Sequence, residues 1–173
     1  RLSRPLDRQT CRVDLGLSSE QIYVVVAGAL QPWQGVADLI EAFAIAAPQT
    51  PGMKLLLVGD GPERAAVHEL AKRFGVADDV TITGFVSEQQ VAKYLSAANV
   101  CVAPYNTQAV DEDEDDKRRY GARMARSPLK LLTYMACGCS IIASHFAETG
   151  AYLMQHDAGL AIPPEDPRAL AAA

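Results

Sequence analysis

The sequence lacks the features on which several large classes of protein depend. None of the apolar runs among its 173 residues is long enough to span a membrane, and no signal peptide opens the chain. Basic residues are outnumbered, with 16 Lys and Arg against 21 Asp and Glu, and the net charge of -5 offers no basic face for a polyanion. We therefore expect a soluble, cytoplasmic protein that does not bind nucleic acid.

Cysteine is also scarce. The four cysteines do not make a disulfide framework for a chain of this size, and Cys101 lies in an apolar, strand-like run, so we expect free thiols. Cys137-Gly138-Cys139 has the spacing of half a metal site, but no second pair with ligand spacing accompanies it. We predict no metal site and no tightly bound cofactor.

What the chain does contain is a regular alternation of two patterns. Apolar residues make up 49% of the sequence and charged residues 21%, which is ordinary for a globular protein with one sizeable core. Buried strand-like runs alternate with amphipathic helical stretches, and the runs lie at 22–28, 53–59, 80–84, 99–104, 140–144 and 159–163. This alternation predicts an α/β fold with a Rossmann-like, doubly wound parallel sheet of about six strands in a single domain, residues 1–173.

The helical stretches give predictions for their inner faces and ends. In the helix after Gly35 the predicted inner face is Leu39, Ile40, Phe43 and Ala44, and in the helix after Asp60-Gly61-Pro62-Glu63 it is Ala66, Leu70 and Phe74. Ser87 and Asp166 are predicted helix starts. Because a helix that begins about seven residues before the last residue is too short to be stable alone, we expect the chain to be a fragment of a longer one.

The stretch from Ser127 to Gly138 carries the signals of a helix whose start could bind an anion. Ser127 can cap free N–H groups, Pro128 suits the first helical position, and Gly138 ends the helix as a left-handed cap. The N-terminus presents unpaired donors and the positive end of the macrodipole, with Lys130 in the same turn. Two interpretations stay open, a phosphate seat and an ordinary capped helix packed on a sheet.

A polar segment, residues 105–126, separates the fourth strand from this helix. It contains an acidic run at 111–116 and a basic run at 117–119. The acidic run lacks the ligand spacing and turn glycine of a calcium loop, so we interpret it as a solvated charge run. Because ligands enter at the carboxyl ends of parallel strands, we expect a mobile loop placed to act as a lid.

Six short motifs follow one another along nearly the whole chain. They are GALQPWQGV at 28–36, LVGDGP at 57–62, TGFVS at 83–87, NVCVAP at 99–104, SPLKLLTYMACG at 127–138 and GLAIPPEDP at 159–167. Their order and spacing resemble the nucleotide-sugar-binding C-terminal half of retaining glycosyltransferases of the two-Rossmann-domain GT-B fold, the glycosyl transferases group 1 family. The resemblance implies that an N-terminal acceptor domain belongs to the same parent chain and is absent from these residues.

The resemblance also implies a donor site. The loop after the first strand and the start of the later helix hold the donor diphosphate, the backbone of the third motif lies against the nucleobase, and Thr133 takes the place of a glutamate that holds the ribose. The donor-binding candidates are Gly28, Ala29, Leu30, Gln34, Gly59, Gly61, Gly84, Phe85, Val86, Ser127, Pro128, Leu129, Lys130 and Thr133. Lys130 is the catalytic candidate, because catalysis is expected to rest on stabilising the charge of the leaving diphosphate.

Several charged anchors of the family are missing at the matching positions. Ala29 and Gln34 stand where the family has a basic pair, Thr133 replaces the glutamate, and Ala125 replaces an acidic residue near the donor sugar. A hydrogen bond to a charged group contributes about 1.5–3 kcal/mol, so these losses weaken donor binding unless other groups substitute, for which Lys130 and Arg123 or Arg126 are the candidates.

Two functions follow from these observations. The first is the donor-binding domain of a glycosyltransferase that moves a sugar from a nucleotide diphosphate to an acceptor with retention of configuration, and which is inactive without its N-terminal domain. The second is a non-catalytic binding or scaffolding module with the same fold. The expected partners are a nucleotide-sugar donor, acting as co-substrate, and the N-terminal domain, and association of the parent enzyme with a membrane surface is kept open.

Overall fold

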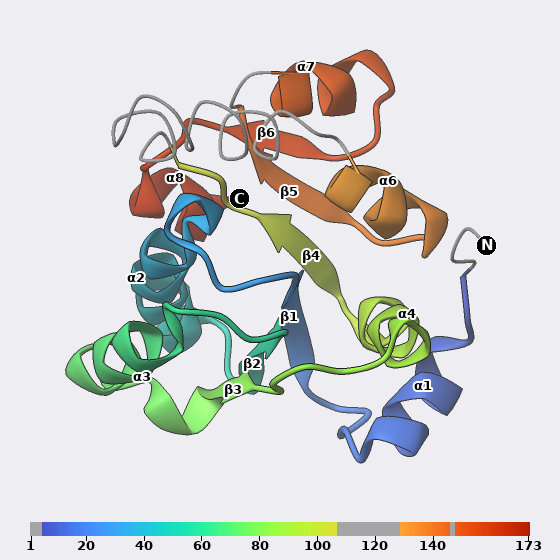
Figure 1. The fold of residues 1–173 in the computed structure, drawn as a ribbon, viewed down its shortest axis with the longest axis horizontal. Helices are drawn as coiled ribbons and strands as arrows, with labels where there is room; N and C mark the ends of the chain where they lie inside the picture. The colour runs from blue at the N-terminus through green and yellow to red at the C-terminus, as the bar shows by residue number, and fades with distance from the viewer. Residues whose placement is uncertain (1–4, 107–128, 146–147) are drawn as a thin grey trace.

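The computed structural model describes residues 5–106, 129–145 and 148–173. Its centre is a six-stranded, all-parallel sheet with helices on both faces (Figure 1). The strands are β1 (Ile22–Ala27), β2 (Met53–Val58), β3 (Val80–Ile82), β4 (Val100–Ala103), β5 (Ile141–Ser144) and β6 (Leu160–Ile162), and they lie in the order β3-β2-β1-β4-β5-β6. This confirms the predicted Rossmann-like sheet and each of the six strand-like runs.

Two layers of helices cover the sheet. The helices are α1 (Arg8–Leu15), α2 (Val36–Ala46), α3 (Arg64–Arg73), α4 (Glu88–Ala97), α6 (Leu129–Ala136), α7 (Glu148–Gln155) and α8 (Pro167–Ala172), with short 3-10 turns at Pro32–Gln34, Ala47–Gln49 and Ala77–Asp79. The apolar sides of α2, α3 and α8 form one core with the sheet, and those of α4, α6 and α7 form the other. None of the described helices is both long enough and apolar enough to cross a membrane.

Local signals in the sequence explain where several helices begin and end. The Ser87 hydroxyl accepts from the Gln90 N–H while the Gln90 side chain bonds back to Ser87, which is a complete capping box at the start of α4. Asp166 caps α8 by accepting from the Ala169 N–H. Gly138 follows α6 in the left-handed region, at φ 71°. The helix starts at Ser87 and Asp166 and the stop at Gly138 are therefore confirmed.

The predicted inner face of α3 is wrong by one position. Val67 and Ala71 are buried, whereas Ala66 is exposed and Phe74 is 38% exposed; Leu70 packs only partly against the core. Val67, Leu70 and Ala71 follow the i, i+3, i+4 spacing of a narrow apolar stripe. This stripe faces the sheet, and the predicted set, with its i, i+4, i+8 spacing, does not. Phe74 stands at the C-terminal cap, past the last turn that covers the sheet.

The start of the expected 105–126 loop is also corrected. Tyr105 and Asn106 are buried, and Asn106 donates from its side chain to the Pro32 carbonyl, Nδ2 to O 2.9 Å. These two residues therefore form a packed segment that follows β4. Residues 107–128, which include the rest of that loop and the candidates Ser127 and Pro128, lie outside the described residues.

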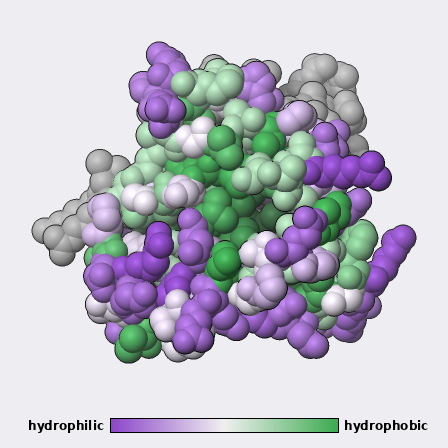
Figure 2. Space-filling view, turned by 180° about the vertical axis from the view of Figure 1, so that it is seen from behind, coloured by the Kyte–Doolittle hydropathy of each residue, from purple (hydrophilic) through white to green (hydrophobic). Residues whose placement is uncertain are grey.

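Seen from behind, the surface carries hydrophobic residues across its middle and hydrophilic residues over much of its rim (Figure 2). Large apolar side chains that are exposed among the described residues include Phe85 at 85% and Leu129 at 66%. Both are candidate donor-site residues at the carboxyl edge of the sheet.

Tyr134 of α6 separates β1 from β4 near the carboxyl ends of these strands. The strands pair at Val24 and Val25, and one ladder step further on Ala27 would donate its N–H to the Val102 carbonyl. Instead, the Ala27 N–H donates to the Tyr134 hydroxyl at 2.9 Å, and that hydroxyl donates to the Val102 carbonyl at 3.3 Å. The strand order reverses between β1 and β4, the point at which open α/β sheets bind ligands.

We expect Tyr134→Phe to lower the free energy of unfolding by about 1–3 kcal/mol, because it leaves a buried N–H and a buried carbonyl without the partner that joins them. Urea denaturation measures this loss. Tyr94→Phe is the matched control, since the Tyr94 hydroxyl makes no hydrogen bond within the described part of the chain. Equal effects of the two substitutions would contradict a bridging role for Tyr134.

Candidate functional site

The loops that follow β1, β2 and β4 meet the start of α6 at the carboxyl edge of the sheet (Figure 1). Backbone contacts hold the loops together. The Leu30 N–H donates to the Asp60 carbonyl at 3.0 Å, the Glu63 N–H donates to the Leu30 carbonyl at 3.1 Å, and the Asn106 N–H donates to the Trp33 carbonyl at 3.3 Å. The edge is thus a connected surface made from three loops that are distant in the sequence.

Two glycines allow this close packing. A Cβ on Gly59, which has φ 147°, would lie 2.0 Å from the Gly28 carbonyl oxygen. A Cβ on Gly35, which has φ 62°, would lie 1.6 Å from the Pro104 carbonyl oxygen. Both positions combine a conformation that L-residues rarely adopt with a backbone neighbour that cannot move away, so only glycine fits.

Most backbone donors of the first loop are already used. The N–H groups of Gly28, Leu30 and Gln31 donate to the carbonyls of Val58, Asp60 and Ala29. The exposed Ala29 N–H, by contrast, makes no hydrogen bond within the described residues. The buried Leu30 side chain, 1% exposed, belongs to the core. In this loop the backbone group that remains available to a ligand is therefore the N–H of Ala29.

Lys130 lies over this loop. Its ammonium donates to the Gln34 Oε1 and is 5.1 Å from the centroid of the Tyr105 ring. Its Nζ is also 3.4 Å from the position that a Cβ on Gly28 would take. No carboxylate among the described residues pairs with it, and burial lowers the pKa of Lys130 to about 7. The site therefore holds a cation whose partners are a neutral amide and an aromatic face.

The first turn of α6 contributes further groups. Leu129 is the first helical residue of the described part of the chain, and its side chain is exposed. The Thr133 hydroxyl donates back to the Leu129 carbonyl at 2.9 Å, so its proton is engaged within the helix. Tyr134, one turn after Lys130, fixes this end of α6 to β1 and β4.

The opposite end of the edge, beyond β3, carries the third sequence motif. The Thr83 hydroxyl accepts from the Gly59 N–H at 3.2 Å and donates to the Gly84 carbonyl at 2.8 Å. Phe85 is exposed, whereas Val86 packs against the core on the side of α4. Asp60 accepts from the Gly61 N–H at 2.8 Å and from the Arg64 guanidinium at 2.9 Å.

The structure brings together Gly28, Ala29, Gln34 and Lys130, and it places Gly59, Gly61 and Gly84 along the same edge. Sequence reasoning did not identify Tyr105, Asn106 or Arg64. Tyr105 and Asn106 could have been suspected, because they follow the Pro104 that ends the fourth strand and so lie at its carboxyl end. Within the described residues no group of three or more His, Cys, Asp or Glu side chains is arranged to hold a metal ion, and none of the four cysteines takes part in a disulfide there.

A comparison with protein families shows to which family this chain is related. The model of the family described as "Glycosyl transferases group 1" matches residues 21–173. The chain belongs to this family. The assignment confirms the resemblance in motif order, and the sheet is that of one Rossmann-like half of a GT-B glycosyltransferase.

Three relatives of this family member are informative. A D-inositol 3-phosphate glycosyltransferase of Segniliparus rotundus is 33% identical over 110 residues, 61% of this chain and 24% of that protein. Sucrose-phosphate synthase from Thermosynechococcus elongatus has a TM-score of 0.76 at 29% identity, covering 98% of this chain and 39% of that one. Anabaena HepE, solved in complex with UDP and glucose, has a TM-score of 0.73 at 22% identity, covering 96% and 40%. The chain thus spans well under half the length of these proteins.

The lowered pKa of Lys130 predicts a specific pH dependence of stability. In the unfolded chain this pKa returns toward 10.5, so between about pH 7 and 10 the unfolded state binds more protons than the folded state. Stability should therefore rise with pH in this window, by at most about 1.4 kcal/mol per pH unit.

Lys130→Met should remove that slope, and urea denaturation of both proteins across the window measures the difference. Other titrating groups are common to the two proteins and cancel. Parallel pH profiles would show that the ammonium is well solvated and that its pKa is not lowered by burial.

Proposed function

We propose that this chain is the donor-binding domain of a glycosyltransferase and that it binds a nucleotide-diphosphate sugar, whose sugar is transferred to an acceptor with retention of configuration. The observation that carries the proposal is the position of Lys130. Its ammonium lies at the N-terminus of α6 and over the loop after β1, at the point where the strand order reverses. A cation and backbone N–H groups converge there, as a diphosphate requires.

The described residues supply three kinds of donor for the diphosphate. These are the N–H of Ala29 and the N–H groups in the first turn of α6, for which the described residues provide no acceptor, and the Lys130 ammonium. When the bond to the sugar breaks, negative charge grows on the leaving diphosphate, and donors already fixed in place stabilise it without reorganisation. We therefore propose Lys130 as the catalytic residue of this half of the enzyme.

The similar proteins support a role in nucleotide-sugar binding and sugar transfer. HepE binds UDP and glucose in its solved complex, and the inositol-phosphate enzyme is a named glycosyltransferase. Because the chain covers only 24% to 40% of the three relatives, we propose that an N-terminal domain completes the acceptor site and that these residues alone do not transfer sugar. We propose that the protein is located in the cytoplasm.

The site is tested by isothermal calorimetry, in which UDP, GDP and ADP are each titrated into the unaltered chain and into Lys130→Met. We expect the substitution to weaken the tightest of these ligands by about ten- to hundredfold, the value of one hydrogen bond from a charged donor. Lys72→Met is the control, because Lys72 is an exposed cation on α3 paired with Glu69. An unchanged dissociation constant for Lys130→Met would reject the phosphate seat.

Two observations favour the alternative, a binding module without catalysis. Gln34 brings no charge to the site, and the Thr133 hydroxyl is engaged with its own helix rather than with a ligand. In that case the fold would persist with a weak or vestigial donor site.

Thr133→Glu separates the two functions. A carboxylate one turn inside α6 can accept two ribose hydroxyls, so we expect ribonucleoside diphosphates to bind more tightly by about 1.5–3 kcal/mol. Pyrophosphate and 2′-deoxynucleoside diphosphates serve as ligand controls, and Thr133→Gln is the uncharged control of the same size. If calorimetry shows no selective gain for the ribonucleotides, Thr133 does not face a ribose and the scaffolding function gains support.

A further inference from the structure

Two cationic side chains stand at the two ends of a strip of backbone without side chains. Gly28, Gly59 and Gly84 follow β1, β2 and β3, which are neighbours in the sheet. Because adjacent strands lie about 4.8 Å apart, the strip is roughly 10 Å long. A Cβ on Gly28 would lie 3.4 Å from the Lys130 Nζ. A Cβ on Gly84 would lie 3.6 Å from Asp60 Oδ2 and 3.7 Å from Arg64 Nη1, the two atoms of the Asp60–Arg64 ion pair.

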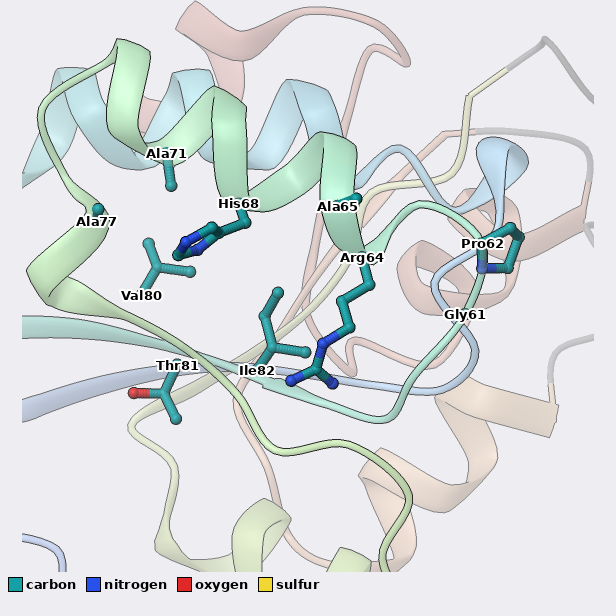
Figure 3. Close-up of a pocket in the computed structure, with 10 residues that line it drawn as sticks. All are labelled: Gly61, Pro62, Arg64, Ala65, His68, Ala71, Ala77, Val80, Thr81 and Ile82. Atoms are coloured by element: carbon teal, nitrogen blue, oxygen red, sulfur yellow. The ribbon is translucent and has the colours of Figure 1, made fainter.

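Arg64 is held at its end of the strip by Asp60. The Asp60 carboxylate accepts from the Gly61 N–H with one oxygen and from Arg64 Nη1 with the other, at 2.8 and 2.9 Å. Figure 3 shows the Arg64 side chain extending from the start of α3 toward Ile82 on β3, between Pro62 and His68 in the lining of a groove of about 700 Å³. The remaining N–H groups of the guanidinium make no hydrogen bond within the described residues, and the side chain is 49% exposed.

The strip has the right dimension for a nucleoside diphosphate. With the diphosphate at Lys130, the nucleoside extends over Gly59 toward Gly84, two positions at which the backbone carries no side chain. The far edge of the nucleobase then comes beside Arg64. The partly exposed guanidinium, fixed through one nitrogen, still has donors to present to that edge.

We propose that Arg64 is a specificity-determining residue that selects donors whose nucleobase presents a carbonyl oxygen, namely uracil or guanine, over adenine. The inference rests on the proposed donor-binding function and adds the class of base. A guanidinium can donate but cannot accept. Guanine O6 and N7, or uracil O4, accept from it, whereas adenine turns an amino group, itself a donor, toward the same place.

Calorimetric titration of the chain with UDP, GDP, ADP and pyrophosphate, for the unaltered protein and for Arg64→Met, tests this assignment. Methionine keeps an apolar stem of similar reach and removes the donors. Arg73→Met is the matched control, since Arg73 is an exposed arginine in the last turn of the same helix. Thermal unfolding of each variant reports whether the fold is kept.

The unaltered protein should prefer UDP or GDP to ADP. In Arg64→Met that preference should fall by about ten- to hundredfold, the discrimination provided by one two-point contact with a base. ADP and pyrophosphate should bind as before, and Arg73→Met should change nothing.

Four results would overturn the proposal. An equal loss for all three nucleotides would place Arg64 on the ribose, and a loss for pyrophosphate would make it a phosphate ligand. Tight nucleotide binding with an unchanged preference in Arg64→Met would reject base selection while leaving the donor-binding function intact. Failure of the unaltered chain to bind any nucleotide would instead reject the proposed function itself, and this inference with it.

Discussion

The Tyr134 hydroxyl is inserted between β1 and β4 at the place of one hydrogen bond of their ladder. The geometry of the site depends on this bridge. By accepting from the Ala27 N–H and donating to the Val102 carbonyl, it satisfies both strands while keeping them apart. Both backbone groups are buried, so neither could be left without a partner at a cost below about 1 kcal/mol. Burial raises the pKa of Tyr134 well above its usual value, and the hydroxyl therefore remains a donor at any working pH.

Because Tyr134 sits one turn after Lys130, the same contact fixes the start of α6 over the loop that follows β1. The loop is fixed from the other side by backbone contacts that only glycine permits, at Gly59 against Gly28 and at Gly35 against Pro104. The cation and the loop are thus each positioned by the core of the domain, and they also contact each other through Lys130 and Gln34. Such a site is formed before any ligand arrives, which is the condition for strong electrostatic stabilisation.

Much of this arrangement could be predicted from the sequence. The alternation of buried runs and amphipathic stretches predicts a parallel sheet, and cap residues such as Ser87 and Gly138 mark helix ends through local chemistry alone. The inner face of α3 was misplaced because Ala66, Leu70 and Phe74 are spaced as regularly as the set that is buried. Local spacing cannot decide between two such stripes. The orientation of the helix on the sheet decides it, and that is a tertiary property.

In the candidate site, too, some residues could be predicted from the sequence and others could not. Lys130 and the glycines were predictable, because helix starts and strand ends have recognisable local sequences. Tyr105, Asn106 and Arg64 contribute through contacts that cross from one loop or strand to another, and no pattern in the sequence records which loops become neighbours. The Ala29 N–H is a further case, since its availability follows only from the hydrogen bonds that its neighbours make elsewhere.

The absence of a second cation at position 34 has a physical consequence for Lys130. Two ammonium groups within hydrogen-bond reach would repel each other strongly in a partly desolvated site. Gln34 removes that repulsion, and its Oε1 accepts a hydrogen bond from the Lys130 ammonium. Because an ammonium can only donate, this contact assigns the amide oxygen to the side facing Lys130 and turns the NH2 group away from it. Position 34 thus gives Lys130 a neutral acceptor in place of a second positive charge.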